Sequence, residues 1–166
     1  MFDLILFADG SVDTKTRIGF GAYLAVNDIT QPITALKAKV KVKQFENTSS
    51  TTLELQTLLW AVGDVILLSE QRKMQIVIYS DSQNIVGLLA RRSGLERRGY
   101  LTNNGKRLNN AELYQQFFNM MDRCNCQIIK VDGHNPQHLK SNVDRVFASV
   151  DKAARSALRN FNKNMI

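Results

Sequence analysis

An apolar run over residues 4–8 ends at an aspartate, Asp9, in the stretch LILFADGSVDTKTRIGFGAYLAV. Short apolar runs bounded by turn residues are typical of buried strands, so we predict strands over residues 3–8 and 18–26. Gly10 and Ser11 are predicted to form a turn between them. Charged side chains rarely lie beside a core unless they have a partner. Asp9 is therefore expected either to brace the turn or to face a cation.

The other apolar patterns predict further strands and helices. Residues 35–43 alternate apolar residues with lysines, which predicts a half-exposed third strand and an antiparallel meander with the first two. The remaining predicted elements are helices over 51–69, from about Ser82, near 110–122 and in the last segment, and strands over 74–80 and 127–131. The order βββαβα(α)αβα implies a five-stranded mixed sheet covered by helices on both faces, an α/β fold of three α/β/α layers. We expect one domain over residues 1–166.

The chain is basic and has few cysteines. Its net charge of +7 favours a polyanionic partner such as nucleic acid, although a basic soluble surface gives the same value. Cys124 and Cys126 form a single C-x-C, which is weak as a zinc site and poorly spaced for a disulfide. We expect reduced thiols in a cytoplasmic protein. No apolar run approaches the ~20 residues of a membrane span, so we expect no membrane partner. We also expect a monomer.

Four acids occupy positions where a carboxylate is unusual. Asp81, like Asp9, follows a predicted buried strand, and ligands of open α/β sheets bind at the carboxyl ends of strands. Glu54 and Asp151 each share a helical stripe with apolar residues and so point inward. Each acid also has a structural explanation when it is taken alone. Asp81 could be a helix N-cap and Asp9 could brace the turn. Glu54 and Asp151 could lie at the edge of their apolar stripes and reach water.

Together, the four acids have to share limited space. Two carboxylates ~4 Å apart repel by about 4 kcal/mol at an effective dielectric constant near 20, so protons or cations must neutralise such a cluster. Hard oxygen ligands favour Mg²⁺ or Mn²⁺. An acidic metal site in a basic protein indicates phosphodiester chemistry with two metal ions.

The residues around these acids resemble the type 1 ribonuclease H family over nearly the whole chain and in the same order. The stretches that carry the resemblance are ADGS with GFGAYL, TTLELQTLLWAV, IYSDSQNIV, RRGYLTNNGKRLNNAELYQQF, IIKVDGHNP and VDKAARSAL. They are similar to that family's opening strands, glutamate helix, D-S-Q strand end, basic protrusion with its following helix, histidine loop and final aspartate helix. The ordered set, more than any one motif, indicates an RNase H-like fold.

The resemblance implies an enzyme that hydrolyses the RNA strand of RNA–DNA hybrids and leaves 5′-phosphate and 3′-hydroxyl ends. The family's four metal-binding carboxylates fall on Asp9, Glu54, Asp81 and Asp151, which would hold two Mg²⁺ ions that Mn²⁺ can replace. The family's loop histidine falls on His134, which would shuttle protons or assist product release. An ordinary exposed loop histidine is the alternative for His134.

The resemblance and the distribution of charge also predict where a hybrid would bind. Cations between Asp81 and the helix near 110–122 form a segment that we call the basic handle, and it would hold the DNA backbone without regard to sequence. A solvated helix face is the alternative interpretation of the same charges. The predicted nucleic-acid contacts are Gly10, Ser11, Ser50, Thr51 and Gln83 together with the handle residues Arg91, Arg92, Arg97, Arg98, Lys106 and Arg107.

The chain departs from the family pattern at two places. Hydroxyl residues 49–52 stand where the family often has a threonine and asparagines before its glutamate. His134 and Asp151 are also further apart than in the family's compact loop, so Asp144, ten residues after His134, competes for the role of fourth ligand. The small residues around Asp151 and the local match VDKAAR favour Asp151.

Three other functions fit parts of the same pattern. One is another nuclease or integrase-like enzyme on the same fold, because a fold alone does not determine the substrate. A non-catalytic hybrid-binding protein is the second, although clustered acids facing phosphates would weaken a pure binder. The third is an α/β domain with purely structural acids, against which the basic handle argues.

Overall fold

The computed structural model describes residues 2–68, 73–132 and 141–165 of the chain. The strands are β1 (Leu4–Asp13), β2 (Ile18–Val26), β3 (Lys41–Phe45), β4 (Gln75–Ser80) and β5 (Asn125–Lys130). The helices are α1 (Ile33–Lys37), α2 (Ser50–Leu68), α3 (Gln83–Val86), α4 (Leu88–Arg97), α5 (Ala111–Arg123) and α6 (Asn142–Asn164).

The five strands form one mixed sheet, as predicted, and their order across it is β3-β2-β1-β4-β5. β1 pairs antiparallel with β2 and parallel with β4, and β5 runs parallel to β4. In the β1–β4 pair Leu4 lies opposite Ile76 and Phe7 opposite Tyr79. The same register, continued by two residues, brings Asp81 level with Asp9.

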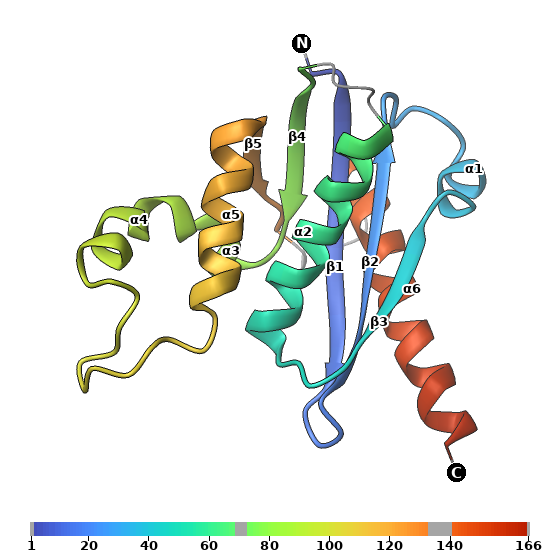
Figure 1. The fold of residues 1–166 in the computed structure, drawn as a ribbon. Helices are drawn as coiled ribbons and strands as arrows, with labels where there is room; N and C mark the ends of the chain where they lie inside the picture. Colours follow the sequence, from blue (N-terminus) through green and yellow to red (C-terminus); the bar gives the residue numbers. More distant parts are fainter. Residues whose placement is uncertain (1, 69–72, 133–140, 166) are drawn as a thin grey trace.

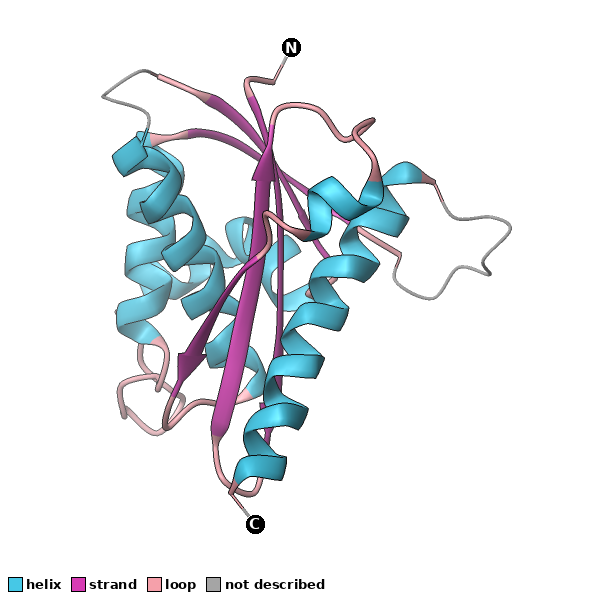
Figure 2. Cartoon of the chain, turned by 90° about the vertical axis from the view of Figure 1, so that its right-hand side faces the viewer, coloured by secondary structure: helices cyan, strands magenta, loops and turns pink. Residues whose placement is uncertain are grey.

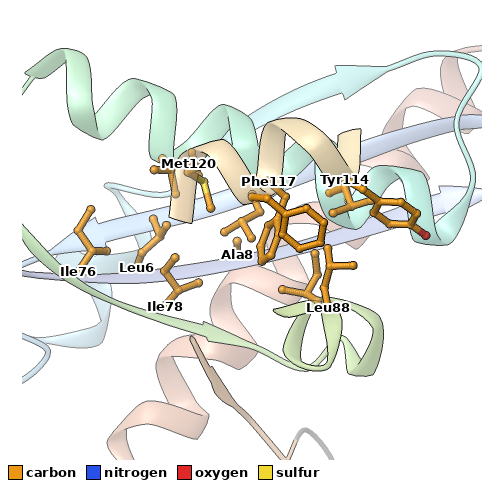
Figure 3. Close-up of a cluster of buried hydrophobic side chains, with 14 of the residues drawn as sticks. Leu6, Ala8, Ile76, Ile78, Leu88, Tyr114, Phe117 and Met120 are labelled. Carbon is orange, nitrogen blue, oxygen red and sulfur yellow. The ribbon is translucent and has the colours of Figure 1, made fainter. Parts of the chain in front are cut away.

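Helices cover both faces of this sheet, which gives the predicted three layers (Figures 1 and 2). Alternate residues of β1 point to opposite faces because side chains alternate along a strand. Leu6 therefore packs into a core with α2 and α5, where Phe117 is fully buried (Figure 3). Phe7 packs into the opposite core, where α6 contributes Phe147. The sheet is thus fixed from both sides at the level of its acids.

Helix α2 is, within the described residues, the one helix long and apolar enough to cross a membrane by length and composition. It packs on β1 and β2 in the middle of the fold (Figure 1). Seven of its side chains are buried and it carries Glu54 and Asp64. These are the features of a core helix that delivers an acid to the sheet.

The first strand is longer than predicted. β1 continues through Asp9, Gly10 and Ser11 to Asp13, and the turn to β2 comes only after it. The predicted turn at Gly10 and Ser11 is therefore wrong, and Asp9 lies within a strand rather than at its end. Ladder pairing with β2 over its whole length outweighs the local turn preference of a Gly-Ser pair.

The predicted strand over residues 35–43 is also wrong in its first half. Residues 33–37 form the short helix α1, which buries Leu36, and pairing with β2 begins only at Lys41. The sheet edge formed by β3 is exposed on both faces, with Lys41 over the ring of Tyr23 and Lys43 over the ring of Trp60. An alternating pattern of lysines therefore marks the edge strand but not where it starts.

Two glycines opposite each other on β1 and β2 let α2 approach the sheet closely. A Cβ atom at Gly10 would lie 2.8 Å from Leu53 Cδ2, and one at its partner Gly21 would overlap the hydroxyl of Thr57. Both distances are shorter than ordinary van der Waals contact. The absence of side chains at these two glycines thus sets how closely α2 packs on the sheet, and with it the position of Glu54.

We predict that Gly21→Ala destabilises the protein by about 1–3 kcal/mol, the usual cost of overpacking a core. Thr57→Ala should relieve most of this loss, because it removes the atoms that the new methyl group would strike. Thr57 itself should tolerate the change, since its buried hydroxyl has no hydrogen-bond partner among the described residues. Urea unfolding of both single variants and the double variant measures the coupling, and additive effects would contradict the close approach.

Candidate active site

Three aspartates from different elements meet at the centre of the sheet. Asp9 lies within β1 and Asp81 directly follows β4, beside it in the parallel register. Asp151, in the middle of α6, shares a side-chain hydrogen bond with Asp9. The structure therefore brings together three acids that are up to 142 positions apart in the chain, from Asp9 to Asp151.

Glu54 joins the same site from the other face of the sheet. It lines one pocket together with Asp9, Asp81 and Ser82. Its Oε2 accepts a 2.6 Å hydrogen bond from the hydroxyl of Ser82. Ser82 is the N-cap of α3, and its Oγ also accepts from the backbone N–H of Ile85 at 3.1 Å. The N-cap of α3 is thus Ser82 and not Asp81.

The pKa values of Asp9 and Glu54 are raised, first by burial and then by the negative charge of Asp81. Burial raises the pKa of Asp9 to about 8, with added repulsion from Asp81 and a hydrogen bond from Asp151. Burial also raises the pKa of Glu54, and Asp81 adds to the rise, whereas the hydrogen bond from Ser82 opposes it. Such a site takes up a proton or a cation readily.

The donor atoms suit a hard divalent cation, because all four acids present oxygen and no cysteine lies among the residues that line the pocket. As the side chains of the described residues stand, no three acids, histidines or cysteines converge on a metal position. Asp151 has an ion-pair partner, since Nη2 of Arg155 lies 2.6 Å from its Oδ2.

Arg92 of the basic handle is engaged within the protein. Its Nε lies 2.8 Å from Glu96 Oε1, and its Nη1 and Nη2 lie 2.7 and 2.8 Å from the two carboxylate oxygens of Asp122. The guanidinium group also lies over the ring of Phe118, 5.1 Å from its centre. Arg92 therefore fastens α4 to α5, and its charge is already neutralised.

The other handle arginines with described contacts have uncharged partners. Arg91 donates to Asn84 and lies over Tyr114, and Arg98 and Arg107 donate to Gly94 O and Gln115 Oε1. Arg97 and Lys106 are exposed. Tyr100, at the base of the handle, is buried in the core. The handle thus keeps several uncompensated charges on an anchored frame, which projects to the left in Figure 1.

Comparison with known proteins agrees with this arrangement. The sequence model of the RNase H family matches residues 2–159. The chain belongs to the RNase H family. The family consists of nucleases of RNA–DNA hybrids that generally use divalent metal ions. A search of curated proteins found no significant match to this sequence.

Solved structures of RNase H domains share the fold at low sequence identity. The RNase H domain of PFV aligns with a TM-score of 0.66 and 15% identity over 94% of both chains. A foamy viral protease-reverse transcriptase in complex with RNA/DNA hybrid aligns with a TM-score of 0.67 and 10% identity, over 93% of this chain and 20% of that one. A foamy viral protease-reverse transcriptase in complex with dsDNA aligns with a TM-score of 0.59 and 9% identity, over 87% of this chain and 91% of that one.

The remaining predicted contacts of the RNase H site lie around the acids. Gly10 and Ser11 continue β1 next to Asp9, and Ser50 and Thr51 form the first turn of α2. Gln83 begins α3, and its Oε1 accepts a 2.7 Å hydrogen bond from Lys130. His134 lies outside the described residues.

Sequence reasoning missed three contributors to the site. Thr52 donates a 2.9 Å hydrogen bond to Oδ1 of Asn110 and so ties the amino end of α2 to that of α5. Asn110 carries no motif of its own, and only tertiary packing brings it to Thr52. Arg155 could have been found, because it stands four residues after Asp151 on a predicted helix, the spacing of a helical ion pair.

Asp144, the competing candidate for fourth ligand, has a structural partner of its own. Its Oδ2 accepts hydrogen bonds from the backbone N–H and the hydroxyl of Ser141 at 3.0 and 3.1 Å. The hydroxyl of Ser141 accepts in return from Asp144 N at 3.2 Å. This capping box holds the first turn of α6, two helical turns before Asp151.

We predict that Asp9→Asn raises the melting temperature in metal-free buffer above about pH 5. The pKa of Asp9 is about 8 in the folded protein and 3.8 ordinarily, so the contribution of Asp9 to stability is complete below pH 4 and is lost as pH rises toward 8. The asparagine cannot ionise, so the variant does not lose this stability. Its melting temperature should rise by about 2–4 °C for each kcal/mol of unfolding free energy regained. Thermal melts from pH 4 to pH 8 measure the difference.

Added Mg²⁺ provides the matching control. It should raise the melting temperature of the wild-type protein, because a ligand that binds the folded state stabilises it. The same addition should have a much smaller effect on Asp9→Asn. Parallel pH profiles of the two proteins without metal would show that Asp9 does not lie in a repulsive cluster.

Proposed function

We propose that this protein cuts the RNA strand of RNA–DNA hybrids by hydrolysis and leaves 5′-phosphate and 3′-hydroxyl ends. The observation that carries the proposal is the meeting of Asp9, Glu54, Asp81 and Asp151 from β1, α2, the end of β4 and α6. Family membership supports the reaction class. Water would attack the phosphorus atom, and the bond from phosphorus to the 3′-oxygen would break.

The four acids would hold two divalent cations, Mg²⁺ or Mn²⁺, and Asp9 is the best placed to contact both because it lies between Asp81 and Asp151. Bound cations of this kind activate water and stabilise a leaving oxygen. The protein supplies the orientation: the hydroxyl of Ser82 fixes Glu54, and the backbone of β1 fixes Asp9. His134 would carry protons or assist product release.

Substrate binding would use both the handle and the surroundings of the acids. Arg97, Arg98 and Lys106 would contact phosphates of the DNA strand through charge, independently of sequence. Discrimination between RNA and DNA needs contacts to 2′-hydroxyl groups in the shallow minor groove. Gly10, Ser11 and Gln83 lie next to the acids and would supply them.

The first turn of α2 would contribute to the same interface. Ser50 and Thr51 lie there, and helix amino ends attract phosphates through their unpaired N–H groups. A related fold is known in complex with RNA/DNA hybrid in the foamy viral protein. We further propose that the protein acts as a cytoplasmic monomer.

A binding protein without activity is the second candidate, and the acids argue against it. Phosphates approaching Asp9, Asp81 and Asp151 without cations would meet repulsion, which a pure binder has no reason to keep. The handle would serve either function equally. Activity therefore has to be tested at the acids.

We predict cleavage of the RNA strand of a labelled hybrid in Mg²⁺, and no cleavage of duplex DNA, duplex RNA or single strands. Asp81→Asn should reduce the rate by orders of magnitude while binding in EDTA stays equal or improves, because repulsion of phosphate is removed. Gel analysis of the products and anisotropy of the labelled hybrid measure the two effects. Equal loss of cleavage and binding in folded Asp81→Asn would refute the ligand role.

Asp151→Asn and Asp144→Asn form a matched pair on one helix. The first should lower the rate by orders of magnitude, whereas the second should cost about 1 kcal/mol of stability through its capping box and leave the rate near that of the wild type. Rates across a Mg²⁺ and Mn²⁺ series, with thermal melts, separate the two effects. A crippled Asp144→Asn with active Asp151→Asn would reverse the assignment.

The handle yields a further contrast. Arg97→Ala with Arg98→Ala should flatten the plot of log affinity against log salt by up to about 0.9 for each phosphate that the variant no longer binds. Arg92→Ala should leave the slope nearly unchanged and lower stability, because its partners are Glu96 and Asp122. Salt titrations of hybrid binding in EDTA, with urea unfolding of each variant, measure both, and an equal slope change in all variants would contradict the assigned roles.

A further inference from the structure

A row of cations runs along α6 away from the acids. Arg155, Arg159 and Lys163 recur every four residues, so they lie on one side of the helix about 6 Å apart along its axis. We call these three residues the α6 stripe. All three are exposed, and the row begins one helical turn after Asp151.

The α6 stripe borders a groove instead of standing on a convex surface. The lining of this groove consists of the three cations together with Ser11, Leu158 and Asn162. Ser11 belongs to β1 and lies two residues after Asp9. The groove is therefore continuous with the strand that carries a central acid of the site.

The end of α6 is held against the sheet, so the α6 stripe has a defined position. The ring of Phe161 packs against that of Phe20 in β2, with 5.7 Å between the centres. Asn162 Nδ2 donates to Oδ2 of Asp13 at the end of β1, over 3.5 Å. A surface fixed on both sides of the groove loses little conformational entropy when it binds a ligand.

The charge of the α6 stripe is largely uncompensated. After Asp151 the sequence has four cations, Lys152, Arg155, Arg159 and Lys163, and no acid. Asp151 pairs with Arg155, whereas Arg159 and Lys163 have no ion pair in the part of the chain that the structure describes. The carboxylate of Asp13, at the far end of the groove, also accepts from the N–H groups of Lys15 and Thr16. The groove thus offers positive charge to an anionic polymer.

The α6 stripe and the basic handle lie on opposite sides of the acids. The handle belongs to the layer of α2 and α5, and α6 covers the other face of the sheet. Figure 1 shows α4 at the left and the end of α6 at the lower right, with β1 and β4 between them. A polynucleotide that crosses the acids therefore meets cations on both sides.

We propose that the α6 stripe binds backbone phosphates of the strand that lies on the acids, on the side away from the handle. The proposal rests on the hybrid-cleaving function above and extends it by a second contact surface. It makes the footprint of the protein two-sided: the handle holds one strand, and the groove beside Ser11 holds the strand to be cut. Contacts of this kind carry no sequence information but fix the register of the strand.

The test uses Arg159→Gln with Lys163→Gln, which leaves Arg155 and its pair with Asp151 in place. The control is Lys37→Gln with Arg123→Gln, two exposed cations near the opposite end of the sheet, where β4 and β5 begin and β2 ends. Both double variants lower the net charge by the same amount. Thermal melts of the three proteins should coincide, because all four side chains are exposed.

Hybrid binding is measured by anisotropy in EDTA over a salt series, so that no cleavage occurs. The stripe variant should flatten the plot of log affinity against log salt by up to about 0.9 per cation removed, and the control variant should not. Equal slopes for the stripe variant and the wild-type protein, or equal flattening by both variants, would overturn the proposal.

A second series locates the contact. Hybrids with a single ribonucleotide stretch are shortened from one side or the other of the cleavage position. The difference in hybrid affinity between the wild-type protein and the stripe variant should vanish when the hybrid is shortened from one side. It should persist when the hybrid is shortened from the other side. Disappearance of the difference from both sides alike would also overturn the proposal.

The two hypotheses fail in different ways. A wild-type protein that cuts the hybrid while the stripe variant keeps its salt slope refutes only the second contact surface. A wild-type protein that neither binds nor cuts the hybrid refutes the proposed function, and the second surface with it.

Discussion

Repulsion between carboxylates is the constraint around which the rest of the molecule is arranged. Asp9 and Asp81 stand level on neighbouring parallel strands, and Asp151 reaches the same point from α6. A chain in which the strands were free to slide would separate these charges. The sheet register, the two packed faces and the cores around Leu6 and Phe7 hold them together, so packing energy maintains an electrostatically unfavourable arrangement.

The partners of each acid divide the site into a fixed and an exchangeable half. Ser82 fixes Glu54 from the end of β4, and the paired backbone of β1 fixes Asp9. Asp151, in contrast, is held by a side chain of its own helix that is more than half exposed, Arg155 at 59%. Glu54 and Asp9 are thus held by groups inside the fold, whereas the partner of Asp151 is a largely exposed side chain.

Much of the fold followed from patterns that are local in the sequence. Apolar periodicity located β2, α2 and β4 closely, and the mixed sheet followed from the order of the elements. The four acids were singled out by their positions relative to these patterns. What the sequence did not reveal depends on contacts between residues far apart in the chain. β1 continues through Gly10 and Ser11 because β2 pairs with it. Arg92 forms an ion pair with Asp122, thirty positions away, so its charge is neutralised within the protein.

The exposed edge of β3 has a consequence for how the protein behaves at high concentration. An unpaired strand edge is a template on which a second chain can add its own strand. Here the ammonium groups of Lys41 and Lys43 each lie 5.8 Å from a ring centre, that of Tyr23 and that of Trp60, so their charges stay on the edge strand. A second copy that adds its own β3 there would have to bring identical lysines against them, and this repulsion opposes pairing between two such edges.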